Sequence, residues 1–440
     1  MAPLYVSSQS PILDAYIQQG LENNQSFLRE QLGTKIQSQA VLEARGMYLP
    51  DISFDASYIW AGGGRNINVA AGDLVNPAYE GLNQLLGENR YPTDIPNFSE
   101  QFLPNDFHET KVRLIQPLLN TDIYYNYQAQ KAQLSVQKAK QIALENQLVK
   151  QIKVAYYQYL SAQDQVVILK DTRQILEELV NVSRKQVAND KATKDIIYGA
   201  QVELSKLEST IAGAERQEQV ARLFFNYLLS RDINEEIARE IEIGDQENAF
   251  EILNVLQESA SSSRAELDQI KYGIEANRAS ILLNKNYIVP KINLVGDLGY
   301  QGFTYQFDDT QDFWFVQLSL SWPIFQGFQN KSKIQKSILQ EKQLQTQLKE
   351  TEDLITLEVA EAYYAYQEAE KIIQSRQFEL QNAQENFRII EKKYALGQAI
   401  LVQYNEARNA FTTAQLQETI AKYNLKIKEA ELESAIHFKN

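Results

Sequence analysis

Four short segments of the chain alternate between apolar and polar side chains, which is the pattern of β-strands with one apolar face. These segments lie at about residues 51–60, 110–117, 291–300 and 313–322. In the clearest of them, FWFVQLSLSWP, every second position from Trp314 to Trp322 is apolar. A strand of about nine residues can cross a membrane at a tilt. A small half-buried sheet packed on helices is the alternative.

The positions of tryptophan favour membrane strands over a soluble sheet. The chain has three tryptophans, and all of them lie at the ends of the apolar faces: Trp60, Trp314 and Trp322. Aromatic girdles at the two membrane interfaces have this placement. Four strands cannot close a membrane barrel, which needs about eight, and an open edge in lipid leaves backbone groups without hydrogen bonds. We therefore expect several chains to donate four strands each to one barrel in a symmetric ring.

Two very long stretches have the period of α-helices instead. From about Thr121 to Val187 there is no Pro and no Gly, and apolar residues recur at alternating spacings of three and four. A second stretch with the same spacing includes Val359 and Tyr394. Such a seam packs helices side by side at shallow angles. Nearly seventy residues would span roughly 100 Å at about 1.5 Å per residue, which indicates a coiled-coil rod or a tube.

Each long helix ends at a short break that predicts a helical hairpin with an exposed tip. Gly397 suits the left-handed turn that terminates a helix, and Asn189 or Asp190 takes its place in the first break. Two such tips predict a docking surface, and a plain helix connection is the alternative. The predicted tip residues are Ala188, Asn189, Asp190, Lys191 and Ala192 in the first hairpin, and Ala395, Leu396, Gly397, Gln398 and Ala399 in the second.

The strands and helices occur twice in the same order, which indicates a tandem duplication. The motif AYYxY at Ala155–Tyr159 recurs at Ala362–Tyr366, displaced by 207 residues (362 − 155), and the prolines before the first strands, Pro50 and Pro290, are 240 apart (290 − 50). The first copy is longer because it carries a long loop. The predicted domains are a first repeat at 1–230 with its loop at 61–109, a connecting segment at 231–262 with a short non-helical piece at 241–244, and a second repeat at 263–440.

Composition excludes several classes of function. The net charge of −14 disfavours a nucleic-acid binder, which needs a basic face. With no cysteine, two histidines and two methionines, we expect no metal site and no cofactor, and no catalytic constellation is recognisable, so we expect no enzyme. The first ten residues do not resemble a signal peptide. The protein is therefore expected either to be cytoplasmic or to have had its signal peptide removed.

Taken together, these features resemble the TolC-like outer-membrane efflux proteins of Gram-negative bacteria over nearly the whole chain. The resemblance rests on the duplication, the proline entries to the first strands, QPL at 116–118, WPIFQG at 322–327, AYYxY in both copies, and YxxG at 394–397. It implies a mainly α fold with a membrane β-barrel: a homotrimer whose twelve strands form one barrel, continued by a periplasmic tunnel of twelve helices. It also implies localisation in outer-membrane lipid, with the signal peptide removed, and tips that meet a periplasmic adaptor protein and, through it, an inner-membrane transporter.

The resemblance further implies a constriction near the tips, held by acidic side chains and a tyrosine-centred network. Tyr394 matches the network tyrosine, and Gln403 and Glu406 match the acidic-ring positions, of which only Glu406 is acidic here. The usual basic position holds Ala399, so the gating pattern is partly absent. Asp190 and Asp195 are candidates for complementary acidic groups in the first tip. Three chains carry 3 × −14 = −42 formal charges, which predicts a preference for cations.

Two functions within this fold and one outside it remain open at the level of sequence. The duct could export drugs or other small molecules, or it could export proteins in a type I secretion system. Copper or silver export is disfavoured by the scarcity of methionine and cysteine. A structural coiled-coil protein without a channel would explain the helices but would leave the tryptophan-bounded strands without a role.

Overall fold

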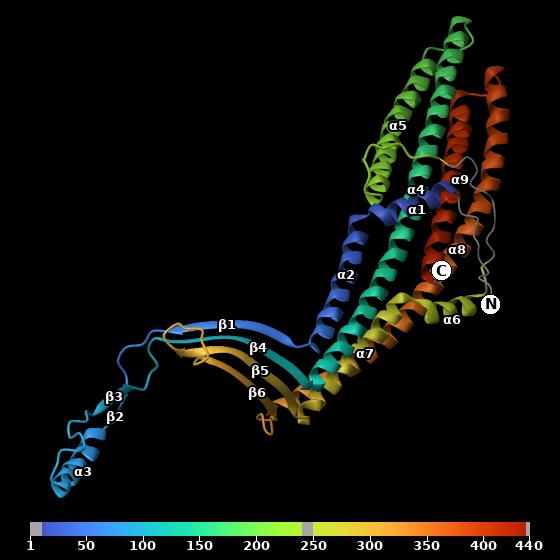
Figure 1. Ribbon diagram of the computed structural model, residues 1–440. Coiled ribbons are helices and arrows are strands. Elements are labelled where there is room, and N and C mark those ends of the chain that lie inside the picture. The colour runs from blue at the N-terminus through green and yellow to red at the C-terminus, as the bar shows by residue number, and fades with distance from the viewer. Residues whose placement is uncertain (1–10, 240–249, 437–440) are drawn as a thin grey trace. The chain divides into compact units, whose positions relative to one another are not determined.

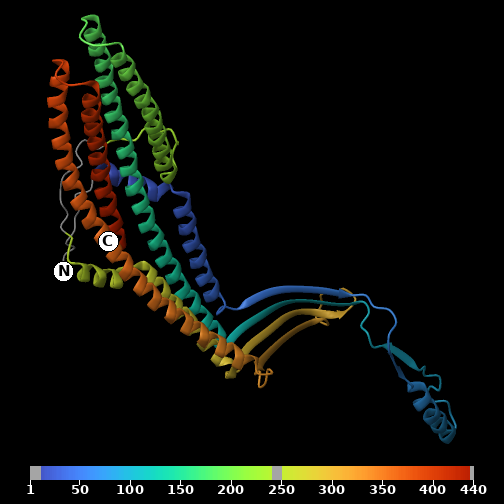
Figure 2. The same ribbon diagram turned by 180° about the vertical axis from the view of Figure 1, so that it is seen from behind.

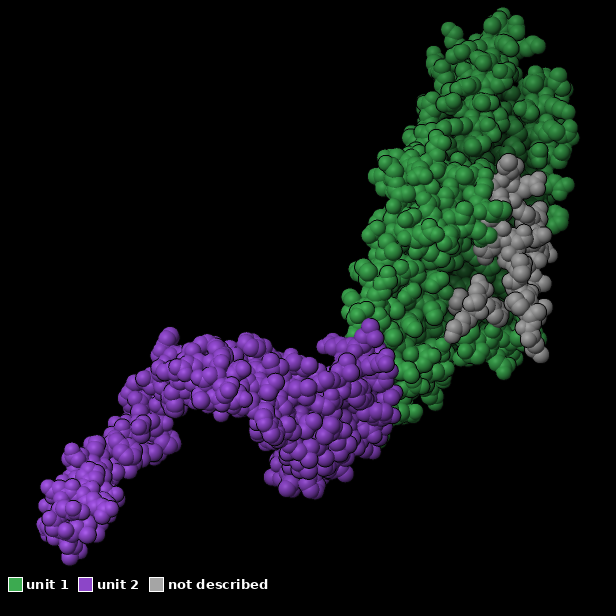
Figure 3. Space-filling model, viewed as in Figure 1, with its two compact units in different colours: residues 1–40, 129–278, 337–440 green, residues 41–128, 279–336 purple. Residues whose placement is uncertain are grey.

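The computed structural model describes residues 11–239 and 250–436, and the long helices dominate it (Figures 1 and 2). The non-helical piece expected at 241–244 lies outside the described residues. The chain divides into two compact units, coloured separately in Figure 3. Unit 1 comprises residues 1–40, 129–278 and 337–440, and unit 2 comprises residues 41–128 and 279–336.

The order of elements repeats along the chain, as the sequence predicted. The first repeat contains α1 (Pro11–Asn23), α2 (Gln25–Gly46), β1 (Asp51–Ile59), β2 (Asn66–Val69), α3 (Ala71–Leu86), β3 (Phe98–Gln101), β4 (Phe107–Leu119), α4 (Thr121–Ala188) and α5 (Asp195–Leu228). The second contains α6 (Leu253–Ser263), α7 (Ala265–Lys285), the 3₁₀ turn η1 (Asn286–Ile288), β5 (Lys291–Phe303), β6 (Asp312–Ser321), α8 (Gln329–Ala395) and α9 (Leu401–Ile436).

The duplication extends to individual hydrogen bonds within unit 1. One residue separates the two short helices at the start of each repeat, Asn24 in the first and Arg264 in the second, 240 positions apart (264 − 24). Asn24 donates from Nδ2 to the carbonyl of Leu228 at 2.8 Å, and Arg264 donates from Nη1 to the carbonyl of Ala435 at 2.9 Å. The two carbonyls are 207 positions apart (435 − 228), the displacement of the tyrosine motifs. In each repeat, a hydrogen bond therefore joins the residue between the first two helices to the C-terminal end of the last helix.

The tyrosine motif occupies equivalent positions in the apolar cores of the two repeats. Tyr159 and its equivalent Tyr366 are both 5% exposed, and each belongs to a cluster of buried apolar side chains. Tyr156 is also buried and donates from its hydroxyl to the carbonyl of Ala238 at 3.2 Å. Ala238 in turn donates from its backbone N–H to the Tyr16 hydroxyl at 2.7 Å. The tyrosines thus bury aromatic area while their hydroxyl groups hold irregular backbone.

The strands of unit 2 form one antiparallel sheet in the order β1-β4-β5-β6. Both hairpins of the sheet are therefore joined through the central pair, β4 of the first repeat and β5 of the second. Within the part of the chain that the structure describes, β1 and β6 each have a strand partner on one side only. The sheet is therefore open at both edges.

The register of the sheet aligns apolar side chains on one face and polar ones on the other. One row across the four strands reads Phe54, Val112, Leu298 and Trp314, and these residues are 70%, 45%, 67% and 76% exposed. The next row, one residue along, reads Ser53, Arg113, Asp297 and Phe315. The alternation predicted from the sequence is confirmed, and the side chains of its apolar face are exposed in the part of the chain that the structure describes.

The segment between β1 and β4 has regular structure that the sequence analysis did not predict. We expected a long loop at 61–109, whereas the structure contains β2 and β3, paired as an antiparallel ribbon, with α3 between them. The clustered Gly and Pro residues of this region favour loops, and α3 itself includes Pro77. No helix among the described residues combines the length and the apolar composition needed to cross a bilayer.

Candidate functional site

The two hairpin tips have the same backbone geometry. Gly397 has a φ of +76°, and Asp190, 207 positions earlier, has a φ of +57°. After each of them the next backbone N–H reaches back five residues, from Gln398 to the carbonyl of Lys393 at 2.8 Å and from Lys191 to that of Gln186 at 2.9 Å. This is the Schellman ending of a helix, in which a left-handed residue reverses the chain. Asp190 is thus the residue that stands in for glycine.

Tyr394, the predicted network tyrosine, lies buried where the two hairpins of the chain meet. Its side chain is 4% exposed. Its hydroxyl oxygen lies 3.2 Å from the hydroxyl of Ser183 on α4, and Gln186 donates from Nε2 to the Tyr394 carbonyl at 3.2 Å. Both bonds join α8 to α4. Tyr394 therefore anchors the end of the second hairpin to the first.

Two further polar contacts join the hairpins below the tips. Arg408 on α9 donates from Nη2 to Oε2 of Glu203 on α5 at 3.0 Å, and the two side chains are 4% and 19% exposed. The hydroxyl groups of Thr172 on α4 and Thr412 on α9 lie 3.2 Å apart and are buried. Burial lowers the pKa of the Arg408 guanidinium, and a hydrogen bond from Lys206 lowers the pKa of Glu203. The ion pair therefore offsets the free-energy cost of removing the Arg408 guanidinium and the Glu203 carboxylate from water.

Aromatic rings fill the space between these polar contacts. The ring centroid of Tyr404 lies 5.0 Å from that of Tyr394 and 5.5 Å from that of Phe387, and Phe387 stacks on Phe411 at 5.6 Å. Burial raises the pKa of the Tyr404 hydroxyl, so this group is neutral at physiological pH. The end of unit 1 that bears the tips is thus an apolar cluster crossed by four polar contacts between the hairpins.

The other predicted gate residues lie outside this cluster. Gln403 is exposed, and its Oε1 accepts a hydrogen bond from the backbone N–H of Ile400 at 3.2 Å, the second half of a capping box at the start of α9. Glu406 is exposed one turn further on the same face. Asp190 and Asp195 are exposed as well, and Asp195 opens α5 and accepts a hydrogen bond from Thr193.

The structure thus brings Tyr394 into a hydrogen-bonded network and leaves the carboxylates on the surface of the single chain. The partners of the network, among them Ser183, Glu203 and Arg408, were not predicted from the sequence. A signal for Arg408 was present, because it is a charge on the face of α9 that otherwise carries Tyr404 and Ala407. Its partner is 205 positions away (408 − 203), which no local pattern reveals.

In unit 2, the predicted aromatic residues lie on the surface around the sheet. Trp60, Trp314 and Trp322 are 82%, 76% and 54% exposed. Trp314 is in β6, Trp60 directly follows β1, and Trp322 directly follows β6. Large exposed indole rings of this kind are typical of contacts with lipid or with another protein.

The polar face of the sheet carries a network of charged side chains. Arg113 on β4 donates two hydrogen bonds to the carboxylate of Asp297 on β5, at 2.8 and 2.7 Å, and Lys111 lies 3.8 Å from the same carboxylate. Lys111 also donates to Glu109 at 2.6 Å. Charged side chains on one face and bare apolar side chains on the other indicate a sheet that separates water from lipid.

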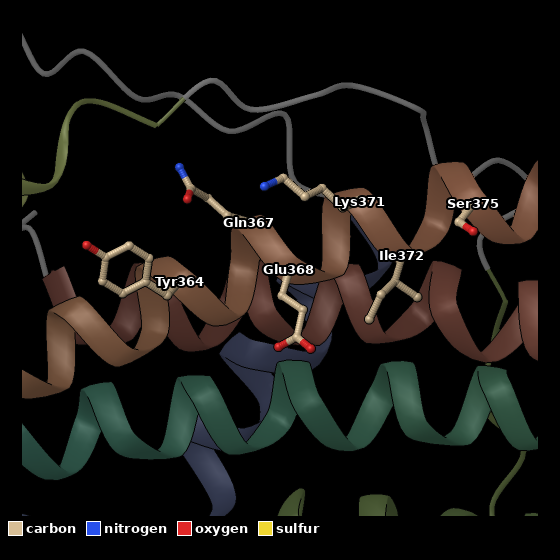
Figure 4. Close-up of a pocket in the computed structure, with 6 residues that line it drawn as sticks. All are labelled: Tyr364, Gln367, Glu368, Lys371, Ile372 and Ser375. Carbon is tan, nitrogen blue, oxygen red and sulfur yellow. The ribbon is translucent and has the colours of Figure 1, made fainter.

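Two apolar stripes are exposed on the long helices of unit 1. On α5 they are Tyr198, Val202, Val220, Phe224 and Tyr227, and on α8 they are Leu354, Leu357, Tyr364, Ile372, Phe378 and Ile389. Both sets follow spacings of three, four and their sums, which is the seam of a coiled coil. Around Tyr364 the α8 surface forms an open hollow of about 390 Å³, in which Glu368 and Lys371 lie between the apolar residues (Figure 4). These seams have no partner helix among the described residues.

The known proteins that this chain resembles in sequence are outer membrane efflux proteins. Residues 256–436 match the family model described as outer membrane efflux protein. The probable efflux pump outer membrane protein TtgC and the antibiotic efflux pump outer membrane protein ArpC, both of Pseudomonas putida, are each 22% identical to this chain over 298 residues, which is 66% of this chain. The chain spans 60% of the length of these curated relatives.

Solved structures share the fold over nearly the whole chain. The outer membrane channel CmeC of Campylobacter jejuni superposes with a TM-score of 0.78 and 14% identity, covering 99% of this chain and 90% of CmeC. CusC superposes with a TM-score of 0.79 and 14% identity, covering 98% and 95%. The outer membrane protein VceC of Vibrio cholerae gives 0.75 and 16%, covering 96% and 95%. The TolC-like resemblance seen in the sequence is confirmed at the level of the fold.

Proposed function

We propose that this chain, which has the fold of outer-membrane channels and an outer membrane efflux protein domain in its second half, is the outer-membrane exit duct of an export system. The observation that carries the proposal is the sheet. Its apolar face is bare, its opposite face is charged, and both of its edges are open.

The open edges determine what the assembly must be. A strand edge left unpaired in lipid costs several kcal/mol for each backbone group, so β1 and β6 need partners. A second copy supplies them, because its β6 can pair with β1 of the first. Three copies contribute 3 × 4 = 12 strands, a number compatible with a closed membrane barrel. The apolar face then meets lipid, and Arg113, Lys111 and Asp297 line the water-filled interior.

The helical stripes support the same symmetric arrangement. The apolar seam of α5 on one copy is complementary in kind to that of α8 on the next, so repeated side-by-side packing buries both. Three copies with four long helices each give a wall of twelve helices around a periplasmic tunnel. The two repeats, α1 to α5 and α6 to α9, serve as the alternating parts of this wall, so the second repeat begins at Leu253, within the segment 231–262 that the sequence predicted as a connection.

The hairpin tips are the docking surface for a periplasmic adaptor in this proposal. Leu396 and Ile400, beside the second tip, are 73% and 64% exposed, which is unusual for large apolar side chains with no partner. In this proposal an inner-membrane transporter, reached through the adaptor, supplies the energy for transport. Tyr394 holds the hairpins closed, and Glu406, repeated three times around the axis, sets a negative constriction together with Asp190 and Asp195.

Small molecules are the cargo that we propose. The names of the curated relatives support this choice, since they describe antibiotic and toluene efflux pumps. Export of whole proteins is the second candidate and would use the same duct. A coiled-coil rod without a channel is disfavoured by the bare apolar face of the sheet, which a soluble rod would expose to water.

Reconstitution of the purified protein tests the proposal. We expect a detergent-dependent trimer by native mass spectrometry, and discrete conductance steps in planar bilayers with a preference for potassium over chloride. A Glu406→Gln variant should retain the trimer and lose part of that cation preference, while Glu350, which is exposed on α8 outside the tips, supplies the matched control Glu350→Gln. A water-soluble monomer without conductance would refute the duct, and an anion preference would refute the role of the acidic constriction.

A further inference from the structure

The inserted helix α3 presents its apolar side to solvent. Leu74 and Leu85 are 76% and 85% exposed, and they are eleven residues apart, which is three turns of helix on one face. Ala78 and Gly81 lie between them on that face. A helix that is apolar on its exposed side is the reverse of an ordinary surface helix.

The opposite side of α3 is held firmly by the chain that follows it. Asn76 exchanges two hydrogen bonds with the backbone of Ile95, at 2.8 and 2.9 Å, and Asn83 exchanges two with the backbone of Tyr91, at 2.6 and 2.8 Å. The rings of Tyr79 and Tyr91 lie 5.2 Å apart. The two asparagines of the helix thus face the chain that follows it, and this orientation places Leu74 and Leu85 outward.

The surroundings of the leucine face favour protein over anionic lipid as its occupant. Helix α3 contains no Lys or Arg, and its charged residues, Asp73 and Glu80, are both exposed. Helices that lie on anionic membrane surfaces carry basic residues on their polar face, because the headgroups attract them. Asp73 and Glu80 lie on one flank of the face that carries Leu74 and Leu85, and such a surface would repel them.

The position of α3 in the chain favours a second copy of the same protein. The insertion leaves the sheet from β1, the open edge that the proposed assembly closes, and returns through β4. Every copy in a closed ring therefore carries one α3 at the same end of its sheet and at the same distance from the symmetry axis. Identical apolar faces repeated around one axis can bury each other. The small residues Ala78 and Gly81 permit close approach of the helix backbones.

We infer that the α3 helices of neighbouring copies pack together through Leu74, Ala78 and Leu85 and form a helical cap at the mouth of the duct. The inference rests on the proposed function, because it requires copies arranged in a ring. It assigns the segment 61–106 a self-associating role. The cap narrows the exit beyond the strands.

Cysteine cross-linking tests the cap with only the introduced thiols, because the sequence of residues 1–440 contains no cysteine. The variant Leu85→Cys places a thiol in the expected contact, and Glu80→Cys places one on the exposed flank of the same helix as the matched control. Both side chains are exposed, so neither change disturbs the fold. With a short bismaleimide on the assembled protein in detergent, we expect covalent dimers and trimers from Leu85→Cys at least five times as abundant as from Glu80→Cys.

A second variant measures the effect of the cap on conduction. Leu74→Asp combined with Leu85→Asp should keep the assembly intact by native mass spectrometry and raise the single-channel conductance about twofold. Equal cross-linking of the two cysteine variants, or an unchanged conductance in the double aspartate variant, would overturn the cap while the assembly persists. Loss of any assembly in the unmodified protein would instead refute the proposed duct, so the two failures are distinguishable.

Discussion

The ion pair between Glu203 and Arg408 provides a quantitative test of how the hairpins are held together. Arg408→Met removes the cation and leaves Glu203 with Lys206, 2.9 Å away, as its remaining partner. Because Glu203 is 19% exposed, we expect a cost of about 1–2 kcal/mol. Glu203→Gln leaves the 4% exposed guanidinium without a carboxylate, and we expect about 2–3 kcal/mol.

The double variant separates the interaction from the loss of each side chain. With both charges removed, Met and Gln fill similar volumes without an unpaired buried charge, so we expect the double variant within about 1 kcal/mol of the natural protein. The two single variants together cost about 4 kcal/mol, so subtracting about 1 kcal/mol for the double variant gives a coupling free energy of about 3 kcal/mol, a factor of roughly 150 in the ratio of open to closed hairpins. The population of the closed state of the hairpins should fall in each single variant and recover in the double variant.

Single-channel recording of open probability in planar bilayers is the assay for this cycle. The exposed pair Lys170 and Glu215, 2.8 Å apart with side chains 48% and 45% exposed, is the control, and Glu215→Gln should change the open probability by less than about twofold. The role of the ion pair in holding the hairpins closed would be refuted if the single variants had the same open probability as this control. It would also be refuted if the open probability of the double variant equalled that of the more open single variant.

Three further predictions concern pH, strand packing and the first tip. The pKa of Glu203 is lowered in the folded protein. The ionised carboxylate therefore contributes to stability above its unfolded pKa of about 4.3, and this contribution is lost as the pH falls through the lower folded value. The fall in melting temperature on acidification should accordingly be smaller in Glu203→Gln than in the natural protein. A Cβ at Gly299 would clash with backbone atoms of β4, whereas one at Gly296 comes no nearer than 3.9 Å to a backbone oxygen. Gly299→Ala should therefore lower the yield of heat-resistant oligomer on gels, and Gly296→Ala should leave it unchanged. Asp190 has a positive φ, so Asp190→Gly should raise the free energy of local unfolding at the first tip by about 0.5–1 kcal/mol in hydrogen exchange, and a decrease would contradict the backbone argument.

The elements with strong periodicity were predictable from sequence. Alternation identified the four strands of the sheet and assigned their faces, because a strand of fixed register admits only two orientations. The uninterrupted helical period identified α4, and a glycine with a suitable context located the second tip. These signals are local, so they need no knowledge of what the segment packs against.

The remaining features could not be predicted, either because they depend on residues far away in the sequence or because the local composition favours a different structure. Helix α3 was missed because it lies among Gly and Pro residues, and because its apolar stripe is short and faces outward. The link between Arg408 and Glu203 joins helices from different repeats, and no spacing along the chain predicts it. Gln403 matched a gate position by resemblance, whereas in the single chain its side chain caps a helix.

The strict alternation of the sheet constrains how this protein can change in length. Loss or gain of one residue within β4 shifts the phase of every later position up to the next turn, so that Arg113 and Lys111 would turn toward the bilayer while Val112 would enter the aqueous lumen. Moving a charge of that kind to the middle of a membrane costs about 2–4 kcal/mol for each residue, and the cost is repeated in every copy. Insertions and deletions should accordingly accumulate at the turns, and inside strands they should be tolerated in pairs. The first repeat already has 34 extra residues between its first two long strands, because Pro50 and Pro290 are 240 positions apart whereas Pro117 and Pro323 are 206 apart (240 − 206 = 34).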